Sequence, residues 1–194
     1  MDQSGGVMEF NLNQDEKKYL LQLARETIKA RLFGRPLPQP EAISENLKTN
    51  TGAFVTLNKN GRLRGCIGYV VGLKPLYQAI QELAIAAAFN DPRFPPLEKE
   101  ELDDVEIEIS VLTPLEPVKD ISEIETGKHG LMVRNGFYEG LLLPQVASEY
   151  GWDRETFLSE TCLKAGLPPT AWQDPRTEIF KFSALIFSEN DGKR

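Results

Sequence analysis

The 194-residue sequence predicts an α+β fold with a largely antiparallel sheet flanked by helices. Helical and strand patterns do not alternate regularly along the chain, as they would in a parallel doubly wound fold. Two Asn-Gly pairs, Asn60-Gly61 and Asn135-Gly136, lie between apolar segments, and this dipeptide favours the tight turn of an antiparallel hairpin. With 41% hydrophobic and 26% charged residues, the composition is that of a globular protein. We expect one domain with its core over about residues 14–188.

The first predicted element is a long helix over residues 14–33, where apolar side chains recur at helical spacing. Asn13 is suited to cap it, and Glu16, three residues later, completes a capping box. The proline-rich segment over residues 36–40 cannot continue the helix, so we expect it to run extended over the surface.

The remaining elements follow from the same contrast between a period of about 3.6 residues and a period of two. They are strands over residues 53–57 and 63–71, a helix starting at Pro75 and ending before Asp91-Pro92, a strand over 105–111, strands over 131–134 and 137–143, a helix over 154–165, and one long strand over 177–187. In the strand over 105–111, Glu106 and Glu108 alternate with apolar residues, so its solvent face is expected to be acidic.

Charge and cysteine content exclude several classes of protein. The formal charge is -7, from 22 basic and 29 acidic side chains, which opposes the attraction on which non-specific nucleic-acid binding depends. The longest strongly apolar stretch, around residues 83–89, is too short to cross a bilayer. Residues 1–13 lack the pattern of a signal peptide, and Cys66 and Cys162 are 96 positions apart, which fits reduced thiols. We therefore expect a cytoplasmic protein without a nucleic-acid or membrane partner.

Seven short motifs, taken in order, resemble the AMMECR domain family over about residues 15–187. They are Leu63-Arg64-Gly65-Cys66-Ile67-Gly68, residues 88–96 (AFNDPRFPP), 106–112, His129-Gly130-Leu131, residues 141–146 (LLLPQV), Tyr150-Gly151-Trp152 and residues 161–167 (TCLKAGL). The resemblance implies a compact α+β fold with two unequal, interleaved sub-domains around an antiparallel sheet. It implies no established reaction. Microbial members are often encoded beside, or fused to, a MEMO-type protein and a radical-SAM protein, so a MEMO-like partner would be a separate polypeptide here.

Cys66 is the strongest candidate for a catalytic residue. On a strand, Arg64 and Cys66 project from the same face, and a neighbouring guanidinium favours the nucleophilic thiolate. Gly65 and Gly68 lack side chains beside the thiol, so a ligand or a second backbone can approach closely. The alternative is that Cys66 is a small buried hydrophobic residue.

His129 is the only histidine and the natural proton carrier near neutral pH. If the fold brings it to Cys66, the imidazole activates the thiol as a nucleophile. The alternative is a solvated or structural histidine beside a turn.

Three further residues are candidates for substrate binding. The rigid loop Asp91-Pro-Arg-Phe-Pro-Pro96 positions Asp91 and Arg93, unless Arg93 pairs with Asp91 or caps the preceding helix. Gln145 follows a predicted strand as a neutral donor and acceptor, unless it is a helix-start residue that bonds to nearby backbone. Cys162 lies on the apolar stripe of its helix and is assigned to the core. With no short ligand spacing, no metal or cofactor is predicted.

Two functions stay open from the sequence. The first is an enzyme, or an enzyme component, that acts on a small molecule through Cys66, with Arg64 stabilising an anion and His129 moving protons. The second is a non-catalytic adaptor that docks a MEMO-like or other protein through the Arg64–Gly68 face and the loop over residues 91–96. No oligomeric state is predicted.

Overall fold

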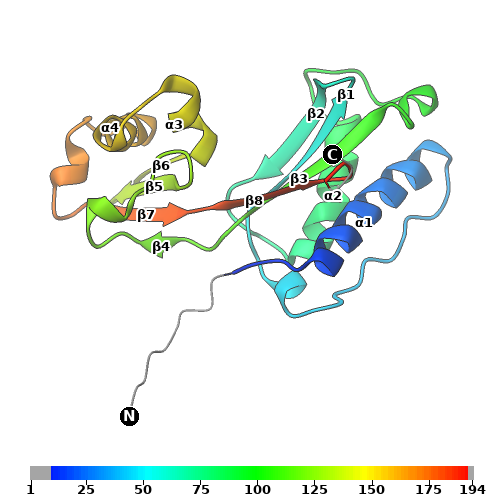
Figure 1. Cartoon of the computed structure of the whole chain (residues 1–194), viewed down its shortest axis with the longest axis horizontal. Coiled ribbons are helices and arrows are strands. Elements are labelled where there is room, and N and C mark those ends of the chain that lie inside the picture. The colour runs from blue at the N-terminus through cyan, green and yellow to red at the C-terminus, as the bar shows by residue number, and fades with distance from the viewer. Residues whose placement is uncertain (1–9, 192–194) are drawn as a thin grey trace, which may run out of the picture. The chain divides into compact units, whose positions relative to one another are not determined.

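A computed structural model describes residues 10–191. The chain divides into two compact units of unequal size (Figure 1): unit 1 consists of Met1–Leu112 with Leu185–Arg194, and unit 2 is the inserted segment Thr113–Ala184. This agrees with the interleaved sub-domains that the resemblance implies. Most of the segment examined for a signal peptide, residues 1–9, lies outside the described residues.

Unit 1 is built on a four-stranded sheet with two helices. Its helices are α1 (Gln14–Leu32) and α2 (Leu76–Phe89), its strands are β1 (Ala53–Lys59), β2 (Arg62–Tyr69), β3 (Val105–Leu112) and β8 (Ala184–Ser188), and short 3-10 turns lie at Asn46–Lys48 and Lys99–Glu101. The strand order β2-β1-β3-β8 places β2 and β8 at the edges. Strand β1 pairs antiparallel with both β2 and β3, as the first Asn-Gly turn predicts for the hairpin.

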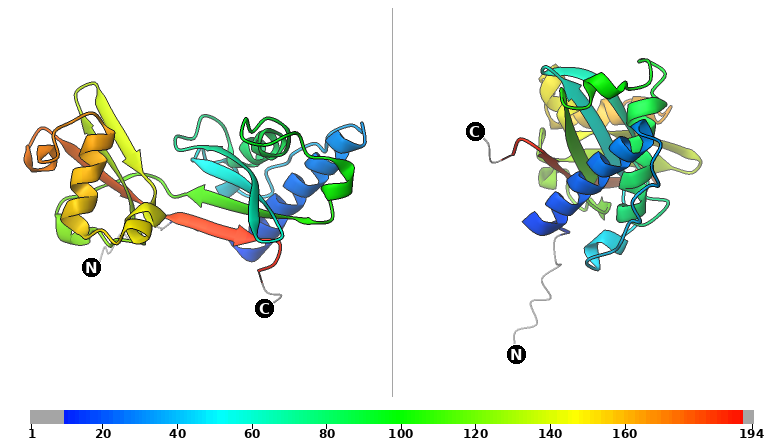
Figure 2. Two further views of the ribbon diagram at one scale, coloured as in Figure 1. Left: turned by 90° about the horizontal axis from the view of Figure 1, so that it is seen from above. Right: turned by 90° about the vertical axis from the view of Figure 1, so that its right-hand side faces the viewer.

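The core of unit 1 lies between the sheet and the two helices, which run along the sheet (Figure 2). Alternate strand residues face this core, among them Val55, Leu57, Ile107 and Ile109, all completely buried. Helix α1 begins at the predicted capping box, in which the Asn13 side chain accepts the Glu16 amide hydrogen and the Glu16 side chain accepts that of Asn13. The other set of alternate strand residues, including Thr56 and Glu108, is half-buried on the opposite, outer face of the sheet.

Unit 2 has its own sheet and its own core. Its elements are β4 (Glu116–Pro117), a 3-10 turn at Ile121–Glu123, β5 (Gly130–Asn135), β6 (Tyr138–Leu142), α3 (Pro144–Tyr150), α4 (Arg154–Lys164), a 3-10 turn at Ala171–Gln173 and β7 (Glu178–Phe182). The strand order is β4-β7-β5-β6, and β5 pairs antiparallel with β6 and β7. Phe157 and Leu158 of α4 are fully buried together with Leu131 of β5.

The prediction of one long strand over residues 177–187 is wrong. The segment forms two strands, β7 and β8, in two different sheets, and the chain changes sheet at Ser183. There the Thr113 amide donates to the Ser183 carbonyl (2.8 Å), and the Ser183 amide donates to Thr113 Oγ1 (2.8 Å). The hydroxyl group of Thr113 thus accepts the Ser183 amide hydrogen, which a backbone carbonyl would accept in a continuous strand. The periodicity of the sequence does not reveal this break. The structure also contains the short helix α3 and the two-residue strand β4, which are not among the elements that periodicity predicts.

Within residues 10–191, no helix has both the length and the apolar character required to cross a bilayer.

Candidate functional site

The backbone of Cys66 is held on the edge strand β2 by the loop that follows α2. Its amide donates to Asp91 Oδ2 (2.9 Å), and Arg93 Nη2 donates to its carbonyl oxygen (3.1 Å). The backbone groups of Cys66 therefore point away from β1, where its cross-strand partner is Thr56. Such a partner pair is not hydrogen-bonded through the backbone, and in these pairs the side chains stand closest together.

The sulfur of Cys66 consequently contacts the hydroxyl group of Thr56. Thr56 Oγ1 donates to Cys66 Sγ over 3.2 Å, and both side chains are half-exposed on the outer face of the sheet. On its other side Thr56 pairs with Glu108 of β3. A thiol, a hydroxyl and a carboxyl group thus form one row across three adjacent strands, which we call the Cys66 row (Cys66, Thr56 and Glu108).

Glu108 is a chemically suitable member of this row. Partial burial raises its pKa above the ordinary value for glutamate, and the negative charges of Glu106 and Asp191 raise it further. A carboxyl group with a raised pKa exchanges protons closer to neutral pH. The alternation in residues 105–111 places Glu108 on a polar face, but only the register of β1 with both neighbouring strands connects it to Cys66.

Arg64 does not lie beside the thiol, where the sequence predicts it. The pairing of β1 with β2 shifts by one residue, from Leu57 with Gly65 to Asn58 with Leu63, which leaves Arg64 as the extra residue of a β-bulge. Its guanidinium is nine-tenths buried and binds Glu101 through two hydrogen bonds, Nε to Oε1 at 3.0 Å and Nη2 to Oε2 at 2.8 Å. The prediction assumed unbroken alternation, and the bulge breaks it.

The two glycines beside the thiol serve packing. A Cβ atom on Gly65 would lie 2.2 Å from the carbonyl oxygen of Ala87. The missing side chain therefore allows the backbone of α2 to approach β2 closely. A Cβ atom on Gly68 would lie 2.4 Å from the ring of Phe54, which covers that position. Neither glycine leaves an opening for a ligand on the side that its own Cβ would occupy.

Asp91 and Arg93 form the ion pair that the sequence left open as an alternative. Two hydrogen bonds join the Arg93 guanidinium to the carboxylate, at 3.0 and 2.8 Å. The pKa of Asp91 is held well below its usual value, first by the hydrogen bond from Arg93 and then by that from the Cys66 amide. Asp91 is buried, whereas the Arg93 side chain is half-exposed, so Arg93 is the member of the pair that a ligand can reach.

The other sequence candidates lie in unit 2. His129 is buried just before β5, and its Nδ1 accepts the Glu125 amide hydrogen (3.0 Å), so any ring proton of the neutral form is on Nε2. Burial lowers the pKa of His129, and the charges of Lys181 and Lys128 lower it further. Cys66 and His129 belong to different units, and their pairing stays a prediction.

Gln145 is exposed in the first turn of α3. Cys162 is completely buried, which raises the pKa of its thiol and confirms its assignment to the core.

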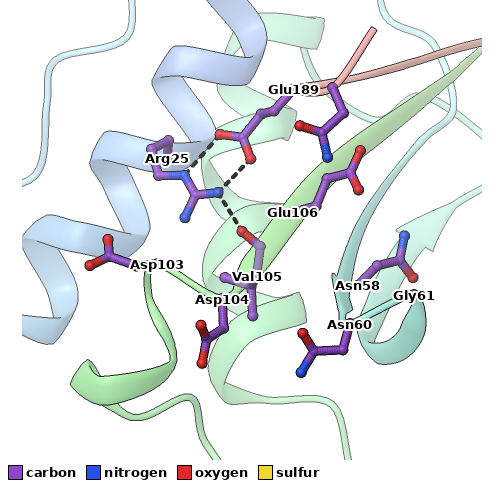
Figure 3. A pocket seen from close by; sticks show the side chains of 10 residues that line it. Arg25, Asn58, Asn60, Gly61, Asp103, Asp104, Val105, Glu106 and Glu189 are labelled. Carbon is purple, nitrogen blue, oxygen red and sulfur yellow. Dashed lines mark hydrogen bonds and ion pairs between the residues drawn. The ribbon is translucent and has the colours of Figure 1, made fainter. Parts of the chain in front are cut away.

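A polar cavity of unit 1 lies at the end of the sheet, near the turn between β1 and β2 and the start of β3 (Figure 3). It measures about 480 Å³, and four acidic side chains line it: Asp103, Asp104, Glu106 and Glu189. Within residues 10–191, no three His, Cys, Asp or Glu side chains are grouped closely enough to hold a metal ion.

The fold and this site define an α+β protein with two interleaved units and a half-exposed thiol on an edge strand. Residues 21–187 match the AMMECR1 family, and the chain therefore belongs to that family. A protein of Methanothermobacter thermautotrophicus is 49% identical over 186 residues, which cover 92% of this chain and 97% of that protein. Protein PF1979 of Pyrococcus furiosus is 45% identical over 93% of this chain and 91% of its own length.

The structure is similar to the crystal structure of the uncharacterized protein PH0010 from Pyrococcus horikoshii. The TM-score is 0.68 at 45% identity, and the match covers 88% of this chain and 90% of that chain. The predicted family and fold class are thereby confirmed.

Proposed function

We propose that the protein is an enzyme, or the thiol-bearing component of one, that acts on a small molecule at Cys66. The observation that carries this proposal is the hydrogen bond from Thr56 Oγ1 to Cys66 Sγ on the half-exposed outer face of the sheet. A structural cysteine is instead completely buried in a hydrophobic cluster, as Cys162 is. A thiol beside a hydroxyl and solvent is instead placed to react.

In this proposal the sulfur of Cys66 adds to a carbonyl carbon of the substrate. A carbon–sulfur bond forms, the π electron pair of the C=O bond moves to the oxygen, and the thiol gives up its proton. The Thr56 hydroxyl group hydrogen-bonds to the sulfur and orients it. Glu108, on the far side of Thr56, accepts or returns the proton through solvent on the half-exposed outer face. Arg93 supports the site in two ways, because it fixes the Cys66 carbonyl and offers a half-exposed cation to an anionic substrate. The cytoplasmic location predicted from the sequence suits a thiol that has to stay reduced.

This proposal changes the roles expected of Arg64 and His129. Arg64 becomes a positioning residue, because its guanidinium is bound to Glu101. His129 remains a candidate proton carrier from unit 2, and the chemistry assigned to the Cys66 row does not depend on it. Gln145 likewise stays a candidate for substrate binding.

Labelling with iodoacetamide tests the proposal, because the chain contains a matched internal control. In the native protein at neutral pH we expect Cys66 to be alkylated at least about tenfold faster than the fully buried Cys162. Peptide mass spectrometry measures the two rates separately, and Cys66→Ser identifies the signal. Equal protection of both cysteines until urea is added would exclude a reactive thiol at Cys66.

A second candidate function is the non-catalytic adaptor, with a MEMO-like protein as its partner. The observation in its favour is the exposed apolar loop after β2, where Val71 is 51% exposed and Leu73 is 76% exposed. Complementation separates the two functions. Cys66→Ser abolishes the function of an enzyme of this kind and leaves an adaptor working.

A further inference from the structure

A second cavity in unit 1 lies at the turn of the β1–β2 hairpin and is rich in cations. It has a volume of about 430 Å³ and is lined by five residues, Lys59, Asn60, Arg62, Leu63 and Arg64, which we call the hairpin cavity. Three of these side chains carry a positive charge. Their grouping follows from the fold, because the Asn60-Gly61 turn brings the ends of the two strands together, and the bulge displaces Arg64 from the regular alternation.

The positive charge of the hairpin cavity is only partly neutralised. Glu101 binds both Lys59, with Nζ to Oε1 at 3.0 Å, and Arg64, at 2.8 Å. The Arg64 guanidinium, the Glu98 amide and Lys59 together lower the pKa of Glu101 to about 2, so this carboxylate is ionised at neutral pH. Arg62 is exposed and forms no ion pair within residues 10–191. The single negative charge of Glu101 therefore balances only one of the three positive charges of the cavity. An excess of positive charge is unusual in a chain with a net charge of -7.

Arg64 contributes a hydrogen-bond donor that the protein does not use. Its Nη1 is buried, and no acceptor in residues 10–191 lies within hydrogen-bond distance. The other guanidinium nitrogens are occupied: Nε by Glu101, and Nη2 by Glu101 and, more weakly, by the carbonyl of Pro96 (3.4 Å). A buried guanidinium nitrogen without an acceptor is costly, and a ligand bound beside Arg64 could supply the missing acceptor.

We propose that the hairpin cavity binds a small oxyanion, the phosphate or carboxylate group of a ligand. Arg64 supplies the unused buried donor, and Lys59 and Arg62 supply the remaining charge. A planar guanidinium held by Glu101 is pre-oriented for this task, since less side-chain freedom is lost on binding. The proposal does not rest on the reactivity of Cys66, because none of the cavity residues belongs to the Cys66 row and only Arg64, as a positioning residue, is common to both proposals.

Nearby acidic groups limit the affinity. Asn60 also lines the acidic cavity of Figure 3, so Asp103 and Asp104 lie near the same turn. Both carboxylates are exposed and screened by solvent. We therefore expect binding of inorganic phosphate in the millimolar range.

The test is a titration of the full chain with inorganic phosphate at constant ionic strength, followed by amide chemical shifts. We expect saturable shifts at the amides of residues 59–64. Arg62→Gln and Arg64→Lys should each weaken binding at least about fivefold, since Arg64→Lys keeps the charge opposite Glu101 and removes the guanidinium donors. Parallel titrations with acetate show whether a carboxylate group also fits.

The control variant is Arg35→Gln, which removes the same charge from an exposed arginine outside the cavity. It should bind phosphate as the unaltered protein does. The proposal is overturned if the shifts do not saturate, if chloride reproduces them, or if Arg35→Gln weakens binding as much as Arg62→Gln.

Discussion

Replacing Arg25 by methionine is expected to destabilise the protein by about 3 kcal/mol, since it removes the cation from a partly buried carboxylate, which keeps only the Ile107 amide as a donor, and takes a donor from two carbonyl groups. The Arg25 guanidinium joins three parts of unit 1. Its Nε binds Glu189 Oε1 (2.8 Å), its Nη1 binds the Leu102 carbonyl (2.8 Å), and its Nη2 binds the Val105 carbonyl (2.7 Å) and Glu189 Oε2. Figure 3 shows this side chain reaching from α1 to Val105 and Glu189.

Urea unfolding followed by far-ultraviolet circular dichroism measures the effect. Tryptophan fluorescence is less suitable, because Trp152 and Trp172, the two tryptophans of the chain, both lie in unit 2. The matched control is Lys29→Met on the same helix, where an exposed ion pair with Glu26 (3.8 Å) is lost and a change within about 0.5 kcal/mol is expected. Equal effects of the two substitutions would contradict a bridging role for Arg25.

Gly65→Ala is expected to destabilise unit 1 by about 3 kcal/mol. The added methyl group would meet the backbone oxygen of Ala87 at 2.2 Å, so α2 would have to move away from the sheet. The control is Gly61→Ala at the hairpin turn, where nothing lies within 4 Å of the new methyl group. Only the strain of its positive φ of 73° applies there, at a cost of about 1 kcal/mol. The same urea titration measures both, and a Gly65→Ala variant as stable as Gly61→Ala would show that α2 is not tightly packed at this point.

Local pattern predicted most of the secondary structure, because the signals involved are local. The capping box at Asn13 and Glu16 and the two Asn-Gly turns act over a few residues, and the structure has them where the sequence predicts them. The break at Ser183 depends instead on Thr113, a residue 70 positions away. No local pattern contains that contact, so the predicted last strand was too long.

The candidate site was predicted less well than the fold, for a related reason. Cys66 was found from its motif, but its neighbours are set by strand register and by one bulge. The register brings Thr56 and Glu108 to the thiol, and the bulge takes Arg64 away from it to Glu101. A bulge needs only one extra residue and leaves the local periodicity almost unchanged. Sequence reasoning therefore gave the correct strand and the wrong cationic neighbour.

The pairing of Asp91 with Arg93 shows the opposite case. Prolines stiffen this loop, and the sequence allows two interpretations of its charged residues, as ligand contacts or as partners of each other. The structure pairs them and uses them to hold the backbone of Cys66. The loop that follows α2 thus satisfies the two outward backbone groups of Cys66, so that at this residue the edge of β2 is not free to pair with another chain.

The central claim is that the Thr56 hydroxyl group activates the Cys66 sulfur. The most direct test is the rate of Cys66 alkylation in Thr56→Val, which keeps the shape of the side chain and removes the donor, with Ser110→Ala on the same sheet face as the control. The account predicts a rate at least about threefold lower in Thr56→Val and unchanged in Ser110→Ala, because only the former removes the hydroxyl donor that orients the Cys66 sulfur. An unchanged rate in Thr56→Val would contradict it.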